Sequence, residues 1–352
     1  MAADLQNGAF APLPWLHRTS REDETEQELL RELGLSAPAS IIRETLIHYY
    51  ISAKSWPLVV LGGPERKAGR RYFELLSRAI VGCCQGQARG LSAQLPSDVR
   101  GGERTADTIQ DRYYWLGLLD VLVEARTPGS EGRAFWVCLE DLTVPQLLSY
   151  LQAWETFSAG DDRPPWPSNL FLSALVPSFE GLWDLDPDAF SRIGIVEVPV
   201  SPDPAADTRP PCCPPVGWQR FVLRTMIREP AVACERLARL GLVPRLQEML
   251  HLAEPLFFRE EGDRLRADLF VYAANSFSGN GQGLLDPSPE GNLREAVDLQ
   301  LAQRVLPYVQ RRFPDILHQT TWLERLSGLF PRARARAQRL HLESLRAEQK
   351  NA

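Results

Sequence analysis

The sequence predicts an α/β protein in which a mostly parallel sheet, with helices on both faces, is followed by an all-helical region. Three observations carry this prediction. Up to residue 200, short apolar runs alternate with segments of helical periodicity, as expected for strands that are buried on both faces between helices. Residues 201–217 are then dense in proline, which continues neither a helix nor a central strand. Beyond them, the apolar residues recur at helical spacing alone.

These patterns divide the chain into four parts. They are an N-terminal arm with an acidic helix (1–35), an α/β core (36–200), a proline-rich linker (201–217), and a helical region with a C-terminal tail (218–352). The acidic helix is expected to follow Ser20, because a capping box precedes its apolar positions, and Gly34 ends it. A length of 352 residues suits one core with a second subdomain.

Strands are predicted from short apolar runs that are bounded by turn residues. Four are expected, at 56–63, 134–139, 169–176 and 193–198. Helical periodicity predicts helices at 41–55, 70–81 and 113–125 in the core, and at 218–252, 265–277, 293–313, 321–329 and 333–348 beyond it. Residues 84–110 and 278–283 are rich in glycine and small polar residues and are predicted to be mostly loop.

The bulk composition is that of a soluble globular protein, with 44% hydrophobic and 24% charged residues. The chain lacks an apolar run near the roughly 20 residues that span a bilayer, and it lacks a signal-peptide pattern, so we expect a cytoplasmic protein without membrane contact. Its six cysteines and five histidines show no metal-ligand spacing, so no metal site is expected. The net charge of −6 argues against broad nucleic-acid binding and leaves only an indirect contact, for example through the basic segment 331–339.

Residues 63–70 come close to a phosphate-binding loop. That loop has the pattern G-x-x-x-x-G-K-[ST] between a strand and a helix, and its lysine and hydroxyl serve the phosphates and Mg²⁺. Counting from Gly63, Ala68 stands at the second glycine, Gly69 at the lysine and Arg70 at the hydroxyl residue. These substitutions predict a degenerate nucleotide site that does not hydrolyse nucleotide.

Lys67 is the remaining lysine of this segment, two residues before the expected position. It could reach a phosphate only if the loop took a different shape. Pro64 also removes a backbone donor, and Glu65 adds a negative charge where phosphates would bind. We therefore expect no cofactor, although ATP or GTP with Mg²⁺ would be the ligand of a rearranged loop that used Lys67 or Arg70.

Further segments resemble the McrB-like family of AAA+ P-loop NTPases. Residues 135–143 are similar to its Walker B strand, where an Asp-Glu pair orients the Mg²⁺ water shell and activates the attacking water; here the order is inverted to Glu140-Asp141. Residues 167–177 resemble its first-sensor strand, with Pro177 in place of the asparagine that positions that water. The resemblance therefore implies that the groups acting within the subunit are impaired.

Two arginines at family motif positions are retained. In 185–197, Arg192 stands at the arginine that can reach the nucleotide of a neighbouring subunit, and Ser191 replaces the aspartate before it. Arg264 stands at the second-sensor arginine of the family's lid. The segments 298–307 and 329–333 also resemble lid motifs, so the resemblance covers most of the chain, from about residue 41 to about residue 340.

The resemblance implies an AAA+ core with a helical lid, in a family that works as rings. The expected function is that of a non-catalytic scaffold or regulator in a hetero-oligomer, with AAA+ subunits or an effector nuclease as partners and defence against foreign DNA as the setting suggested by analogy. Two alternatives stay open. The chain could hydrolyse ATP or GTP weakly through a rearranged loop, or it could be a monomeric docking module for an effector.

Overall fold

The structure is a computed structural model of the chain. It describes residues 26, 30, 42–63, 66–81, 88–92, 118–127, 130, 133–140, 144, 147, 167–200, 218–257, 259–313, 326 and 328–351. The linker 201–217 lies outside the described residues, as do most residues of the predicted helices 20–33 and 321–329.

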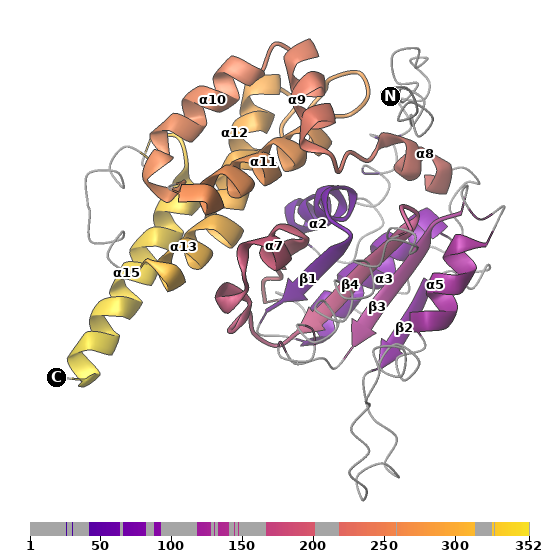
Figure 1. Ribbon diagram of the computed structural model, residues 1–352, viewed down its shortest axis with the longest axis horizontal. Coiled ribbons are helices and arrows are strands. Elements are labelled where there is room, and N and C mark those ends of the chain that lie inside the picture. Colours follow the sequence, from indigo (N-terminus) through magenta and orange to yellow (C-terminus); the bar gives the residue numbers. More distant parts are fainter. Residues whose placement is uncertain are drawn as a thin grey trace, which may run out of the picture.

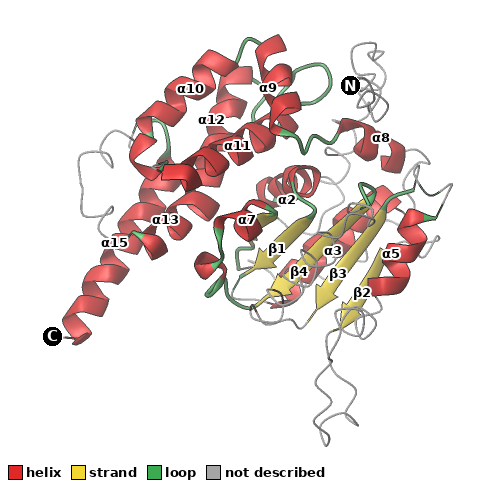
Figure 2. Cartoon of the chain, in the orientation of Figure 1, coloured by secondary structure: helices red, strands yellow, loops and turns green. Residues whose placement is uncertain are grey.

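A parallel sheet with helices around it confirms the predicted α/β class (Figures 1 and 2). Its strands are β1 (Leu58–Gly62), β2 (Ala88–Ser92), β3 (Phe135–Glu140), β4 (Leu170–Val176) and β5 (Ile193–Glu197). They are ordered β2-β3-β4-β1-β5, so β1 lies between β4 and β5. Successive strands in the chain are therefore joined by crossovers, as expected when helices cover both faces.

Residues 84–110, predicted to be mostly loop, contain one strand that was not foreseen, and the rest of this segment lies outside the described residues. Strand β2 pairs in parallel with β3, from Ala88 opposite Trp136 to Ser92 opposite Glu140. Its sequence, ARGLS, has no β-branched or aromatic residue, so the local pattern carries no strand signal. Pairing with the buried strand β3 forms this edge of the sheet.

Apolar residues on β1, β3, β4 and β5 point alternately to two hydrophobic layers, as the pleat requires. One layer joins Val59 and Leu61 to helices α2 (Arg43–Ser55) and α3 (Arg66–Val81). The opposite layer joins Leu58 and Val60 to buried residues of α5 (Leu118–Arg126) and to the segment before β5. Both faces of the sheet are therefore buried.

The helical region packs against the β5 side of the sheet, with α2 between the two parts (Figure 1). Its main helices are α8 (Trp218–Thr225), α9 (Pro230–Arg239), α10 (Val243–Leu252), α11 (Arg259–Asn275), α12 (Pro289–Gln300), α13 (Leu306–Arg312) and α15 (Pro331–Asn351). A five-residue π-helical segment joins α12 to α13. The single helix predicted at 218–252 is wrong, because α9 begins at Pro230 and α10 begins at Val243, with Pro244 in its first turn.

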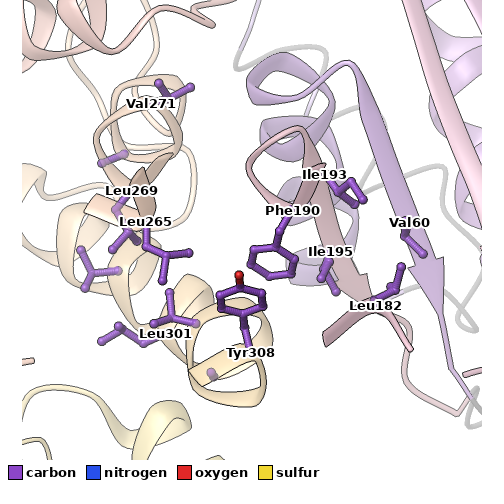
Figure 3. Close-up of a cluster of buried hydrophobic side chains, with 14 of the residues drawn as sticks. Val60, Leu182, Phe190, Ile193, Ile195, Leu265, Leu269, Val271, Leu301 and Tyr308 are labelled. Atoms are coloured by element: carbon purple, nitrogen blue, oxygen red, sulfur yellow. The ribbon is translucent and has the colours of Figure 1, made fainter. Parts of the chain in front are cut away.

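The sheet and the helical region share one hydrophobic cluster. Figure 3 shows Phe190 and Ile195 on one side of this contact, facing Tyr308 and Leu301 on the other. The rings of Phe190 and Tyr308 stack with their centroids 4.0 Å apart. Apolar burial therefore fixes how the helical region sits on the core.

The described residues of the N-terminal acidic segment, Glu26 and Leu30, are both helical and buried. The Glu26 carboxylate accepts hydrogen bonds from Lys54 Nζ (3.0 Å) and from the Tyr50 hydroxyl (2.9 Å), and both donors belong to α2. Through Glu26, the described part of this segment therefore contacts α2 of the core. Within the described residues, each helix is too short or too polar to cross a membrane.

Candidate functional site at the carboxyl edge of the sheet

The carboxyl ends of β1 and β3 bring part of the predicted nucleotide site together. In open α/β sheets, ligands bind beyond this edge, next to the strand where the connections diverge. Here that strand is β1, which lies between β4 and β5, and α3 begins just after it. The arrangement of strand, turn and helix that the sequence predicts is present.

The turn itself is shorter than the predicted loop. Only residues 63–65 separate β1 from α3, which begins at Arg66 and not at residue 70. Five of the eight positions aligned with the phosphate-loop pattern, 66–70, are therefore helical. Among these five positions, only the N–H group of Arg70 lies beyond the first turn and bonds within the helix, because the first four N–H groups of a helix lack an intrahelical partner.

The glycines of this segment have packing roles. A Cβ atom on Gly63 would lie 2.1 Å from the carbonyl oxygen of Val198, whose own N–H donates to Gly62 O at 2.7 Å. A Cβ on Gly69 would approach a methyl group of Leu175 to 3.2 Å. The lysine position of the pattern therefore lies on the face of α3 that packs on the sheet.

Arg70 and Glu140 meet directly. Arg70 Nη1 lies 3.3 Å from Glu140 Oε2, and Arg70 Nε lies 2.9 Å from Glu74 Oε1. Hydrogen bonding to Glu74 and the charge of Glu140 raise the pKa of Arg70. A guanidinium thus lies between two carboxylates where the pattern expects a hydroxyl and a carboxylate to share Mg²⁺.

The described groups at this edge do not fit a magnesium nucleotide. The cation from Arg70 occupies one of the carboxylate oxygens that would orient the metal's water shell, and α3 begins inside the eight positions that the phosphate-loop pattern needs. The side chain of Lys67 and the whole of Asp141 lie outside the described residues. Their predicted roles therefore stay predictions.

Arg192 lies at the amino ends of the strands, away from the turn that follows β1. It follows the short helix α7 (Pro187–Ser191), directly before β5, and its side chain is exposed. Because Ile193 pairs with Leu58 at the start of β1, the length of the strand, roughly 16 Å, separates Arg192 from the turn. Arg192 therefore cannot reach a nucleotide at the turn after β1 of its own chain.

Arg264 is not brought to the turn either. Its Nη1 lies 2.6 Å from Asp188 Oδ1 on α7, and both side chains are exposed. The residue predicted to sense nucleotide within the subunit thus contacts α7, the short helix that ends just before Arg192. In this structure Arg264 ties α11 to α7.

Arg304 is the main polar anchor of the helical region, and sequence reasoning gave it no role. Its side chain is 1% exposed and donates to the carbonyl oxygens of Ile193 (3.1 Å) and Phe190 (2.9 Å). It also pairs with Asp268 at 2.7 Å. Its guanidinium carbon lies 4.6 Å and 4.9 Å from the ring centroids of Phe190 and Trp56. These partners span four separate segments, so no local pattern predicts them.

His48 forms a second polar link between the core and the helical region. Its Nδ1 lies 2.6 Å from the Tyr272 hydroxyl, and its Nε2 lies 3.1 Å from Gln303 Oε1, which also accepts from Glu197 N–H at 2.8 Å. Since Gln303 Oε1 can only accept, Nε2 carries the proton and Nδ1 accepts from Tyr272. Burial lowers the pKa of His48 from 6.5 to about 4, so the ring is neutral near pH 7.

The first turn of α15 contacts the start of α2 through charged groups. Arg332 Nη2 lies 2.7 Å from Glu44 Oε1, and Arg332 also pairs with Glu295. The buried Asp298 carboxylate accepts from the N–H groups of Arg332 (3.0 Å) and Ala333 (2.8 Å). The segment 329–333 therefore lies against the core.

A cavity of about 680 Å³ lies beside this contact. Its apolar lining includes Leu30, Ile47 and Leu284, and its charged lining includes Arg43 and Glu44. The turn after β1 and Arg70 are not part of its lining. The cavity is thus separate from the degenerate loop.

The chain was compared with protein-family models, with curated proteins and with solved structures, and none of the three comparisons gave a match.

Proposed function

We propose that this chain is a non-hydrolysing member of the AAA+ class, related to the McrB-like family, that acts as a scaffold or regulator in a hetero-oligomer. The ion pair between Arg70 and Glu140 carries the proposal. The guanidinium of Arg70 neutralises the Glu140 carboxylate that would otherwise attract Mg²⁺. Its positive charge also repels the metal ion. The three-residue turn before α3 supports the same conclusion.

The AAA+ assignment is supported by the order of the parts. A parallel sheet has a strand, a glycine turn and a helix at its centre, and a helical region follows in the chain. The motifs at Glu140 and Arg192 fall at the ends of β3 and directly before β5. Function itself is inferred from the site, because a fold alone supports many functions.

The proposed role toward a partner rests on Arg192. An arginine at the amino edge of the sheet is too far from its own turn to act there, but it can contact a nucleotide in a neighbouring AAA+ subunit. Such arginines stabilise the charge of the phosphoryl-transfer transition state. The chain would then lend a cation to an active partner while its own site stays closed.

Calorimetry with Mg-ATP and Mg-GTP tests the proposal that the chain does not hydrolyse nucleotide. The purified chain is expected to show neither micromolar binding nor turnover. The variant Arg70→Thr restores the hydroxyl and breaks the ion pair, yet it is expected to stay inactive because the turn is still short. Micromolar binding with turnover by the unmodified chain would disprove the non-hydrolysing assignment.

Assays with candidate partners test the proposed role of Arg192 toward a neighbouring subunit. Candidate AAA+ subunits are mixed with the chain, and their nucleotide turnover is measured. Arg192→Ala is expected to lower the stimulated turnover by about tenfold or more, whereas Arg239→Ala on α9 leaves it unchanged. If no AAA+ subunit responds to the chain, or if both variants behave alike, the role of Arg192 is wrong.

A further inference from the structure

Two backbone carbonyl groups next to Arg192 are held by one side chain of the helical region. Arg304 donates from Nη2 to the carbonyl oxygen of Phe190 (2.9 Å) and from Nε to that of Ile193 (3.1 Å). The first contact lies two residues before Arg192 and the second lies one residue after it. The backbone that carries the exposed side chain of Arg192 is therefore held on both sides by a single buried guanidinium.

Helix α7 contributes little to fixing the direction of Arg192. It has five residues, and a helix this short is not stable without outside contacts. Its first turn is capped by Asp186, whose carboxylate accepts hydrogen bonds from two backbone N–H groups. At its other end, the N–H of Arg192 donates to the carbonyl oxygen of Ala189 over 3.3 Å, which is long for such a bond. The end of α7 that carries Arg192 therefore depends on the contacts from Arg304.

Arg304 belongs to the π-helical segment Leu301–Val305. Such segments are rare and are found frequently at functional sites. The residue before it, Gln303, accepts a hydrogen bond from the N–H of Glu197 (2.8 Å), at the other end of β5. Ile193 and Glu197 are four residues apart on this strand, so their polar groups face the same edge. Two consecutive side chains of the helical region therefore hold both ends of the last strand in the sheet order.

Other contacts fix the guanidinium of Arg304 itself. Asp268 on α11 pairs with it at 2.7 Å. The ring centroids of Phe190 and Trp56 lie 4.6 Å and 4.9 Å from its central carbon, and Phe190 in turn stacks on Tyr308 of the helical region (Figure 3). A shift of the helical region against the core is therefore passed to the backbone on both sides of Arg192.

We propose that Arg304 is a positioning residue for Arg192 and sets the direction in which the Arg192 side chain leaves the protein. The inference rests on the role of Arg192 proposed above, and it adds that the helical region controls this role. A group that stabilises a transition state has to be held within about 0.5 Å of its productive position. The placement of the helical region then determines how well Arg192 can serve a neighbouring subunit.

Electron paramagnetic resonance of a nitroxide at position 192 tests this positioning on the chain alone. The label is attached to Arg192→Cys, in a chain whose other cysteines are serine except for the buried Cys138. The spectrum of this parent chain is expected to contain an immobilised component. Arg304→Lys is expected to lose that component, because a single ammonium group cannot replace the planar fork that binds both carbonyl oxygens.

Three controls separate positioning from stability. Asp268→Asn removes the charged partner of Arg304 but keeps the guanidinium and both carbonyl contacts. Leu237→Ala opens a cavity in the buried cluster on α9 and lowers the midpoint of urea unfolding without touching these contacts. Both variants are expected to keep the immobilised component. A label on the natural Cys234, which is exposed on α9, is expected to give the same spectrum with and without Arg304→Lys.

The spectra decide the proposal without any partner protein. It is overturned if the parent lacks the immobilised component, if Arg304→Lys keeps it, or if Leu237→Ala loses it to the same extent. With an AAA+ subunit that responds in the assays above, Arg304→Lys should lower the maximal stimulated turnover and leave the concentration of chain for half of the effect unchanged. If none responds, the role of Arg192 toward a partner is refuted, while the spectra still show whether Arg304 positions it.

Discussion

At the residue scale, buried charges decide how the helical region is held. Arg304 and Asp268 form an ion pair in which the arginine is 1% exposed. Burial raises the pKa of Asp268, which the charge of Arg304 opposes. An isolated charge at this depth is strongly unfavourable, so each partner depends on the other.

Replacing Arg304 with methionine is expected to destabilise the protein by about 3–5 kcal/mol, because Asp268 and two carbonyl oxygens lose their donor. Urea unfolding measures the change. Arg311→Met is the control, since its pair with Asp184 is exposed at 60% and 50% and such pairs contribute about 0–1 kcal/mol. Equal effects of the two variants would contradict the anchoring role of Arg304.

His48 makes the stability depend on pH. Its pKa is about 4 when folded and 6.5 otherwise, so in this window the unfolded chain binds more protons at this site. The free energy of unfolding therefore falls as the pH is lowered from about 6.5 to about 4, by up to about 3 kcal/mol from this group. The glutamine of His48→Gln does not bind a proton in this range. The free energy of unfolding of this variant is therefore expected to fall less as the pH is lowered. Unfolding of both proteins at pH 7 and pH 5 measures the difference, and an unchanged decline would count against this assignment.

At the scale of elements, the backbone between β1 and α3 differs from the one that the sequence motif predicts. The pattern of glycine and basic residues at 63–70 predicts a damaged phosphate loop. In the structure α3 begins at Arg66, because its first turn packs Gly69 against Leu61 and Leu175. Tertiary packing thus extended the helix into residues whose composition suggested a loop.

Gly63→Ala tests whether this glycine serves packing. The added methyl group would meet the Val198 carbonyl oxygen at 2.1 Å, so a loss of about 1–3 kcal/mol in the free energy of unfolding is expected. Gly328→Ala is the control, since nothing lies within 4 Å of its Cβ position. Thermal unfolding compares the two. A neutral Gly63→Ala would mean that the turn is not closed against Val198.

The sequence predicted most elements and missed those that depend on distant partners. The strands at 134–139, 169–176 and 193–198 were recognisable because each is a short and mostly apolar run. Strand β2 was not, because its five residues lack strand-forming side chains and owe their pairing to β3. Arg70 and Glu140 were predicted to belong to one site, but their direct ion pair was not foreseen.

At the scale of the whole molecule, the core and the helical region share one hydrophobic cluster. Phe190 and Ile195 of the core meet Tyr308 and Leu301 of the helical region (Figure 3). The buried Arg304 and His48 cross the same boundary. The proline-rich linker marks a change of architecture, but the packing joins both parts.

A single cooperative unfolding transition is therefore expected for the full chain. Far-ultraviolet circular dichroism follows mainly the helices, and tryptophan fluorescence follows residues such as Trp56 and Trp136 in the core. The two midpoints in urea should coincide. Separate midpoints would mean that the helical region unfolds independently and that the shared cluster contributes little.

The sequence alone determined the α/β class, the order of the two parts and the degenerate positions at Ala68, Gly69 and Arg70, because these follow from local periodicity and residue identity. Tertiary structure alone decided the rest. It started α3 at Arg66, paired Arg70 with Glu140, and placed Arg264 beside Asp188. These outcomes depend on contacts between residues far apart in the chain, and such contacts are set by packing and burial, which no local pattern records.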